Sequence, residues 1–174
     1  MKLSLSLTLI TGAALLGLGH NTTAQSSDTK ATKSETKVPL LEKKVLGLEA
    51  ARKIMAAAIK EAEKNHWAGV VAIVDDGGWL ILLERMDHAA MTASVELAAE
   101  KARSAALFKK PSQQLEEAIN HGRYAAITAR GFVEMQGGLP VVVDGEVVGA
   151  IGASFAKPEQ DVQIAQAGLA ALTR

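Results

Sequence analysis

The chain has 174 residues, a formal net charge of zero and no cysteine. Without cysteine it can form no disulfide, zinc–thiolate site, iron–sulfur cluster or covalent C-x-x-C-H haem attachment. Residues 45–174 carry 13 basic and 16 acidic side chains, and aromatic residues make up 3% of the chain. This composition argues against both a basic nucleic-acid-binding face and a base-stacking platform.

Residues 1–24 have the pattern of a secretory signal peptide. Lys2 precedes an uncharged run, rich in Leu, Ala and Gly, over residues 3–18, and Thr22-Thr23-Ala24 offers small residues for cleavage. The run is shorter than the roughly 20 residues that span a bilayer. We therefore expect cleavage after Ala24, a periplasmic or secreted protein and no stable membrane insertion afterwards. A retained N-terminal anchor is the alternative.

Residues 25–44 are rich in Ser, Thr and Lys and contain few large apolar side chains. Such a segment cannot bury enough surface to offset the entropy lost on ordering, so it is predicted to be a disordered linker. Residues 45–174 then form one domain, long enough to bury a hydrophobic core without disulfides.

The first half of this domain is predicted to contain a helix, a β-hairpin and a second helix. Apolar residues recur at helical spacing over 48–65. Two short β-branched runs, 69–74 and 79–83, flank Asp75-Asp76-Gly77-Gly78, whose residues suit a tight hairpin turn. An alanine-rich helix is expected over 92–108.

The second half begins with a helix that Pro111 can open and that runs to about Gly122. Two more strands, 139–143 and 146–153, flank Asp144-Gly145, a strong two-residue hairpin signal. Pro158 opens a last helix. Because hairpins join consecutive strands, the sequence predicts an α/β domain with a largely antiparallel sheet and helices packed on it.

The segment just past the second predicted strand, Glu84 to His88, holds the densest group of reactive side chains. Arg85 could grip a carboxylate with two hydrogen bonds. Met86 or His88 could ligate a soft or borderline metal. The structural alternative is an ion pair between Arg85 and Asp87, with His88 in solvent.

Two further candidates lie on the central helices. Lys101 lies among small alanine side chains, a shallow surface that suits a neighbouring helix, a second subunit or a flat ligand. His121 ends the following helix, where the helix dipole alone favours histidine. The sequence has no G-x-S-x-G elbow, no H-E-x-x-H and no phosphate-binding loop, so no hydrolase or nucleotide site is indicated.

Residues from about 46 to 172 resemble the GlcG/HbpS family, also called the DUF336 or haem-degrading-domain family. The resemblance rests on several segments in the right order. These are Val71-Ala72-Ile73-Val74-Asp75-Asp76-Gly77-Gly78, Arg85-Met86-Asp87, Lys101 through Phe108, Lys110-Pro111-Ser112, Gly137-Gly138-Leu139-Pro140, Asp144-Gly145, Gly149-Ala150-Ile151-Gly152 and Pro158-Glu159-Gln160-Asp161.

The resemblance implies a profilin-like α/β sandwich, in which helices flank an antiparallel sheet of about five strands. It also implies assembly into homo-oligomers, from dimers to octamers. Three positions depart from the usual family pattern. His88 and His121 stand where the family usually has a different, often small, residue, and Phe155 adds bulk before the last helix.

The resemblance and the signal peptide together favour an exported, non-covalent haem b-binding protein with a role in haem, iron or redox sensing. A binding protein is favoured over an enzyme. Haem needs an apolar slot, an axial ligand and cations for its propionates. His88, which is also the candidate metal ligand, or His121 could be axial. Arg85 and Lys101 could pair with the propionates, beside Met86 and Asp87.

Two alternatives stay open at this point. The protein could be a binder of, or weak enzyme for, a small organic acid held by Arg85, Asp87, Lys101 and the helix start at Pro158. It could instead be an oligomeric interaction module without a small ligand, with the alanine-rich helix as its interface.

Overall fold

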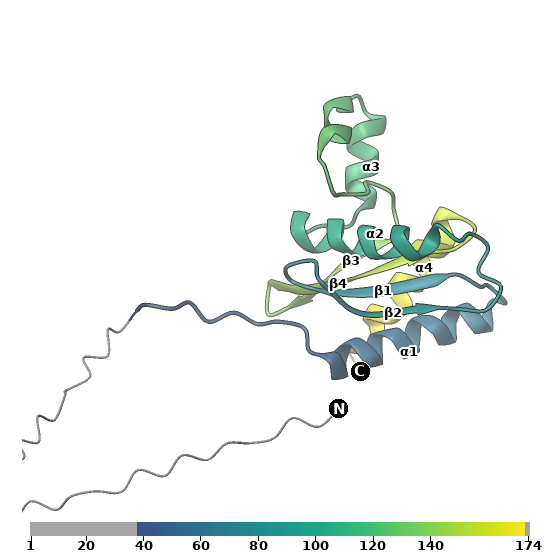
Figure 1. Cartoon of the computed structure of the whole chain (residues 1–174), viewed down its shortest axis with the longest axis horizontal. Coiled ribbons are helices and arrows are strands. Elements are labelled where there is room, and N and C mark those ends of the chain that lie inside the picture. The colour runs from purple at the N-terminus through teal and green to yellow at the C-terminus, as the bar shows by residue number, and fades with distance from the viewer. Residues whose placement is uncertain (1–37, 173–174) are drawn as a thin grey trace, which may run out of the picture. The chain divides into compact units, whose positions relative to one another are not determined.

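A computed structural model describes residues 38–172, and the folded unit begins at Leu41. The predicted signal peptide and most of the predicted linker lie outside the described residues. Every predicted helix and strand of the domain is present (Figure 1). In chain order the elements are α1 (Leu48–Lys64), β1 (Val70–Asp75), β2 (Leu80–Arg85), α2 (Ser94–Phe108), α3 (Gln113–Asn120), η1 (Tyr124–Thr128), β3 (Gly138–Val143), β4 (Glu146–Ser154), α4 (Pro158–Leu169) and η2 (Ala170–Leu172).

The strands form one antiparallel sheet in the order β2-β1-β4-β3. The predicted fold class is confirmed, but the described residues form four strands, not about five. Each of the two hairpins supplies two strands. Leu46 donates one backbone hydrogen bond to the Val148 carbonyl, at 2.8 Å, without starting a further ladder.

Both hairpin turns follow from local chemistry. Asp144 and Gly145 have φ values of 50° and 80°, and two positive φ values match the right-handed twist of the flanking strands. In the other turn, the Asp75 carboxylate accepts the backbone N–H groups of Gly77 and Trp79 at 2.9 and 2.8 Å. Asp75 therefore acts here as a turn-forming residue.

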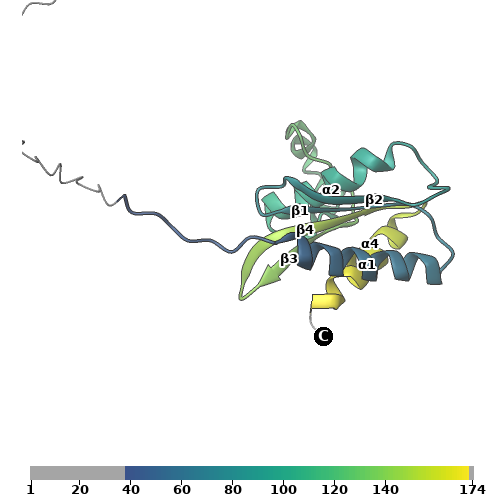
Figure 2. The same ribbon diagram turned by 60° about the horizontal axis from the view of Figure 1, so that its bottom comes forward.

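Helices cover both faces of the sheet (Figure 2). α1 and α4 pack against each other on one face and enclose the main core, with fully or nearly fully buried side chains of Ile54, Met55, Val71, Ile73, Ile151, Phe155 and Ile164. On the opposite face, α2 packs its small side chains onto β1 and β4, namely Ala98, Ala102, Ala105 and Ala106. These alanines are buried within the chain, so the expectation that they form an interface with another molecule is wrong.

The packing of α2 is close enough to require glycine in the sheet. A Cβ atom on Gly152 would overlap the Ala98 carbonyl oxygen, and one on Gly138 would overlap the Lys101 carbonyl oxygen. Both overlaps are with helix backbone, which cannot move aside as a flexible side chain can. Helix–sheet distance on this face is therefore set by glycine in the strands and alanine in the helix.

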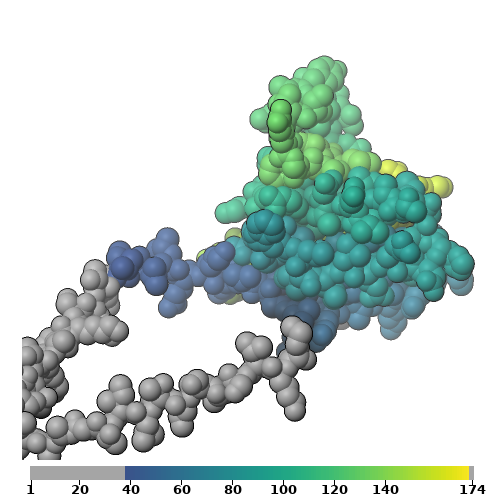
Figure 3. Space-filling model, viewed as in Figure 1, coloured from purple at the N-terminus to yellow at the C-terminus, as the bar shows by residue number. Residues whose placement is uncertain are grey.

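α3 and η1 extend away from the layered part of the domain, and Figure 3 shows this green segment as a protrusion. No residue of either element is buried. One tie back to the domain is the Glu116 carboxylate, which accepts the Gln136 backbone N–H at 2.6 Å. Glu116 therefore lines a pocket together with Lys101 and Asp161, while most of the segment contacts solvent.

Residues 41–44 adopt no helix or strand, but ion pairs join them to the two hairpin turns. Lys43 pairs with Asp76 at 2.7 Å, and Lys44 pairs with Asp144. Whether residues 25–44 as a whole are disordered stays a prediction. Among residues 38–172, no helix is long and apolar enough to cross a bilayer.

We expect Gly152→Ala to destabilise the domain by about 2 kcal/mol, because overpacking against a rigid neighbour typically costs about 1–3 kcal/mol. Urea unfolding followed by circular dichroism measures the change. The matched control is Gly47→Ala, where a new Cβ meets no atom within 4 Å. Equal losses for the two variants would contradict the close-packing argument.

Candidate functional site

The loop that follows β2 forms an open pocket of about 170 Å³, lined by Arg85, Met86, Asp87, His88, Ala89, Met91 and Thr92. The Met86 N–H still donates to the Gly69 carbonyl at 3.0 Å, and the chain then turns at His88, where φ is 61°. Arg85, Asp87 and His88 are exposed, whereas Met86 packs against the main core. Chain continuity and this turn place the four predicted residues around one hollow.

The ion pair between Arg85 and Asp87, which was the structural alternative for this loop, does not form. Neither side chain makes a hydrogen bond or ion pair with any residue in the 38–172 range. The guanidinium, carboxylate and imidazole of this loop are therefore all available to a ligand.

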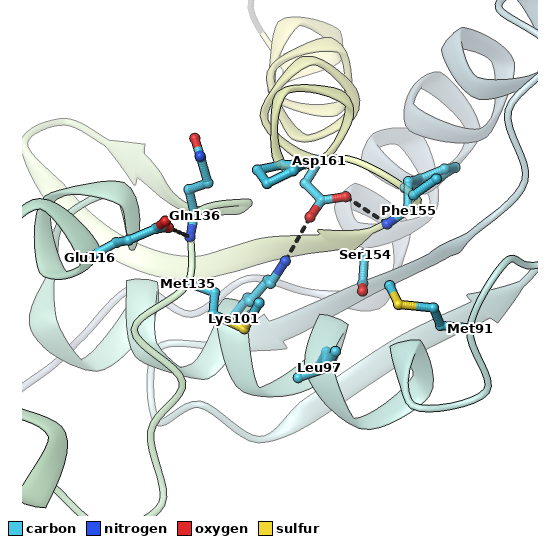
Figure 4. Close-up of a pocket in the computed structure, with 11 residues that line it drawn as sticks. Met91, Leu97, Lys101, Glu116, Met135, Gln136, Ser154, Phe155 and Asp161 are labelled. Carbon is cyan, nitrogen blue, oxygen red and sulfur yellow. Dashed lines mark hydrogen bonds and ion pairs between the residues drawn. The ribbon is translucent and has the colours of Figure 1, made fainter. Parts of the chain in front are cut away.

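Lys101 has a different environment. Its side chain is 3% exposed, and its Nζ lies 2.6 Å from Oδ2 of Asp161, whose side chain is 4% exposed (Figure 4). The other oxygen, Oδ1, accepts the Phe155 backbone N–H at 2.6 Å. The pair joins α2 to the first turn of α4 and uses one of the three N–H donors of Lys101.

The buried pair lies at the base of a second pocket, of about 140 Å³. Its apolar walls are Met91, Leu97, Met135, Phe155 and Pro158, and Glu116, Gln136 and Ser154 add polar groups. Met91 lines both pockets, so the two adjoin. The polar residues come from five separate parts of the chain, and Figure 4 shows Lys101 pointing toward Asp161 and the Glu116 carboxylate pointing toward the Gln136 backbone.

The structure therefore divides the predicted site residues into three places. Arg85, Met86, Asp87 and His88 share the loop pocket, and Lys101 lies in the adjoining one. His121 is at the exposed end of α3, where its Nδ1–H donates to the Glu117 carbonyl at 2.6 Å. His121 lines neither of the two pockets, and Arg85, Asp87, Lys101 and Pro158 are divided between these adjoining pockets.

Sequence reasoning missed Asp161 as the partner of Lys101. Its position in the first turn of a helix explains an acidic residue there through the helix dipole alone, so the sequence held no sign of a buried contact. Met91 and Met135 were also missed, because isolated methionines carry no spacing signal.

In the part of the chain described, no group of three or more His, Asp or Glu side chains could hold a metal ion. His88 would therefore have to bind a metal whose other ligands come from elsewhere, as they do when a porphyrin supplies four nitrogens. The sequence-based choice of His88 as the metal ligand stays a prediction.

Comparison with known proteins places this fold in a family. The family model described as "Haem degrading protein HbpS-like" matches residues 46–170. The chain belongs to this HbpS-like family. Protein GlcG of Escherichia coli (strain K12) is 45% identical over 112 residues, which are 64% of this chain and 83% of that protein.

Two solved structures relate the HbpS-like fold to this chain. A double mutant of Streptomyces reticuli HbpS has a TM-score of 0.71 at 33% identity, covering 76% of this chain and 90% of that chain. A PduOC–haem complex has a TM-score of 0.67 at 30% identity, covering 73% of this chain and 94% of that chain. Haem is thus bound by at least one protein of the same fold.

The loop pocket fits haem in its donor chemistry and only partly in its size. His88 offers a nitrogen of the type that holds haem iron, and Arg85 offers a cation for a propionate. Pockets that enclose ligands of drug size usually measure about 300–1,000 Å³, and this one measures about 170 Å³. One chain could therefore hold a haem by one edge or one face and would leave the rest uncovered.

The free energy of unfolding of the Lys101→Met variant should be lower than that of the wild type by about 3–5 kcal/mol, because the variant leaves the Asp161 carboxylate buried without its cation. Adding Asp161→Asn should recover part of that loss, since the amide is neutral and its oxygen can still accept the Phe155 N–H. Urea unfolding of the wild type, both single variants and the double variant measures the coupling. Additive losses within about 0.5 kcal/mol would show that the two side chains do not interact.

Burial raises the pKa of Asp161 above its ordinary value of 3.8, against the opposing effects of the Lys101 ammonium and the Phe155 N–H. The folded state then binds the Asp161 proton more readily than the unfolded state, so the contribution of this titration to stability falls as pH rises through the folded pKa. The difference in free energy of unfolding between the wild type and Asp161→Asn, measured by urea unfolding, should therefore decrease from pH 4 to pH 7. An increase over that range would contradict the direction.

Proposed function

We propose that the protein is exported and binds haem b without a covalent link at the loop pocket from Arg85 to Thr92. The observation that carries the proposal is the presence of an exposed imidazole and an exposed, unpaired guanidinium around one hollow. Membership of the HbpS-like family and the haem complex of a structural relative support the choice of ligand.

Each side chain of the loop has a defined role in this proposal. His88 would supply a nitrogen ligand to the haem iron, and Arg85 would pair with a propionate. Met86 and Met91 provide apolar contact for the ring, and Asp87 lies at the pocket rim. When bound, haem would supply a redox-active iron, which suits a role in haem, iron or redox sensing outside the cytoplasm.

We also propose homo-oligomerisation, from dimer to octamer, and this proposal rests on haem binding at the loop pocket. The loop pocket is too small to enclose a haem, and an exposed apolar haem face is costly in water. A second copy of the chain that covers this face would remove that cost. Met91, which is 41% exposed at the junction of the two pockets, is an apolar residue available for such a contact.

The geometry does not favour the two alternatives raised by the sequence. A small organic acid held by Arg85, Asp87 and Lys101 together would have to span two pockets and would place its carboxylate beside that of Asp161. An interaction module built on the alanines of α2 would need a face that the sheet already covers.

Hemin titration followed by the Soret band tests the proposal. The protein should be expressed in a bacterial host with its own signal sequence and recovered from the periplasm, with Gln25 expected as its first residue. We expect a saturable Soret shift for the wild type and at least about tenfold weaker binding for His88→Ala, because the variant lacks the axial nitrogen.

The matched control is His121→Ala, which removes an exposed imidazole at the far end of α3 and should bind hemin as the wild type does. Arg85→Ala should weaken binding less than His88→Ala and leave the Soret maximum in place. Unchanged binding by His88→Ala would refute the loop site, and the absence of any saturable shift would refute haem binding.

A further inference from the structure

We propose that the pocket at Lys101 and Asp161 is a second binding site, for a small uncharged carbonyl compound whose oxygen accepts a hydrogen bond from Lys101. This site adjoins the proposed haem site at Met91, but the proposal does not depend on haem binding.

The first observation is the incomplete hydrogen bonding of a buried ammonium. Lys101 has three N–H donors, and within residues 38–172 it has one partner, Oδ2 of Asp161. Its side chain is only 3% exposed, so bulk water does not surround it. A buried donor without an acceptor is costly, and an oxygen atom in the adjoining pocket would satisfy it.

The charges around the pocket favour an uncharged ligand. The ammonium of Lys101 and the carboxylate of Asp161 balance each other, and Glu116 adds a second carboxylate to the wall. An anion bound at Lys101 would lie beside both carboxylates, and a cation would lie beside the ammonium. A carbonyl oxygen accepts a hydrogen bond and brings no net charge.

The walls and the volume limit the rest of the ligand. Met91, Leu97, Met135 and Phe155 present apolar surface, which suits a short hydrocarbon chain. The pocket measures about 140 Å³, below the roughly 300–1,000 Å³ of sites for drug-sized ligands, so only a small ligand fits. A three- or four-carbon aldehyde or ketone meets all of these conditions.

Methionine methyl groups give a direct measurement of occupancy. The chain has five methionines; Met91 and Met135 line this pocket, and Met55 is in the main core. In protein labelled with ¹³C at the methionine methyl groups, butan-2-one should shift the Met91 and Met135 signals saturably and leave the Met55 signal in place. Butanoate, which is similar in size but anionic, should bind at least about tenfold more weakly.

A variant that fills the pocket separates specific binding from solvent effects. Leu97→Phe should reduce butan-2-one affinity at least about tenfold while leaving the Lys101–Asp161 pair intact. The matched control is Leu107→Phe, the same change at an exposed position of the same helix that does not line the pocket. Lys101→Met should also abolish binding, and Leu97→Phe keeps the test decisive if that variant does not fold.

Three results would overturn the inference. The first is the absence of a saturable shift at Met91 and Met135, which would mean that the pocket holds only water. The second is an equal affinity of the wild type and Leu97→Phe for butan-2-one. The third is tighter binding of butanoate than of butan-2-one. His88→Ala should bind butan-2-one as the wild type does, so failure of the haem proposal and failure of this one can be told apart.

Discussion

A buried ion pair between Lys101 and Asp161 joins two helices that pack on opposite faces of the sheet. Lys101 comes from α2, and Asp161 comes from the first turn of α4. Asp161 also accepts the Phe155 N–H, in the segment that leaves β4. One carboxylate thus fixes the relative positions of a helix on each face and the end of a central strand. Because both side chains are almost fully buried, neither charge can lose its partner without a large cost.

The close packing of α2 on the sheet makes this ion pair possible. Gly138 and Gly152 lack the Cβ atoms that would overlap α2, and the alanines of α2 add little bulk between helix and strands. Gly137, with φ of 116°, lies against both members of the ion pair. A Cβ atom at this position would contact the side chains of Asp161 and Lys101. The Gly137-Gly138 pair therefore serves close backbone approach and not phosphate binding. The same geometry leaves room beside Lys101 for the pocket.

The sequence predicted one part of the candidate site well and another poorly. Arg85 and His88 were expected to act together, and they do share a pocket, because residues in one short turn after a strand must lie close together. Lys101 was expected in the same site, but its helix turns that side chain toward α4. His121 belongs to α3, which extends away from both pockets. A residue type and a helix position are visible in sequence, but the direction of a helix face depends on what it packs against.

The sequence by itself determined the two hairpins, the antiparallel sheet and the exclusion of thiol chemistry. Turn residues such as Asp144-Gly145 and alternating apolar runs act through contacts only a few residues apart, so their effect can be read locally. Only the tertiary structure decided that the alanines of α2 cover the sheet, that Asp161 neutralises Lys101 and that two pockets adjoin at Met91. Those contacts join residues up to 60 positions apart, and their free energy comes from burial that exists only once the layers have packed.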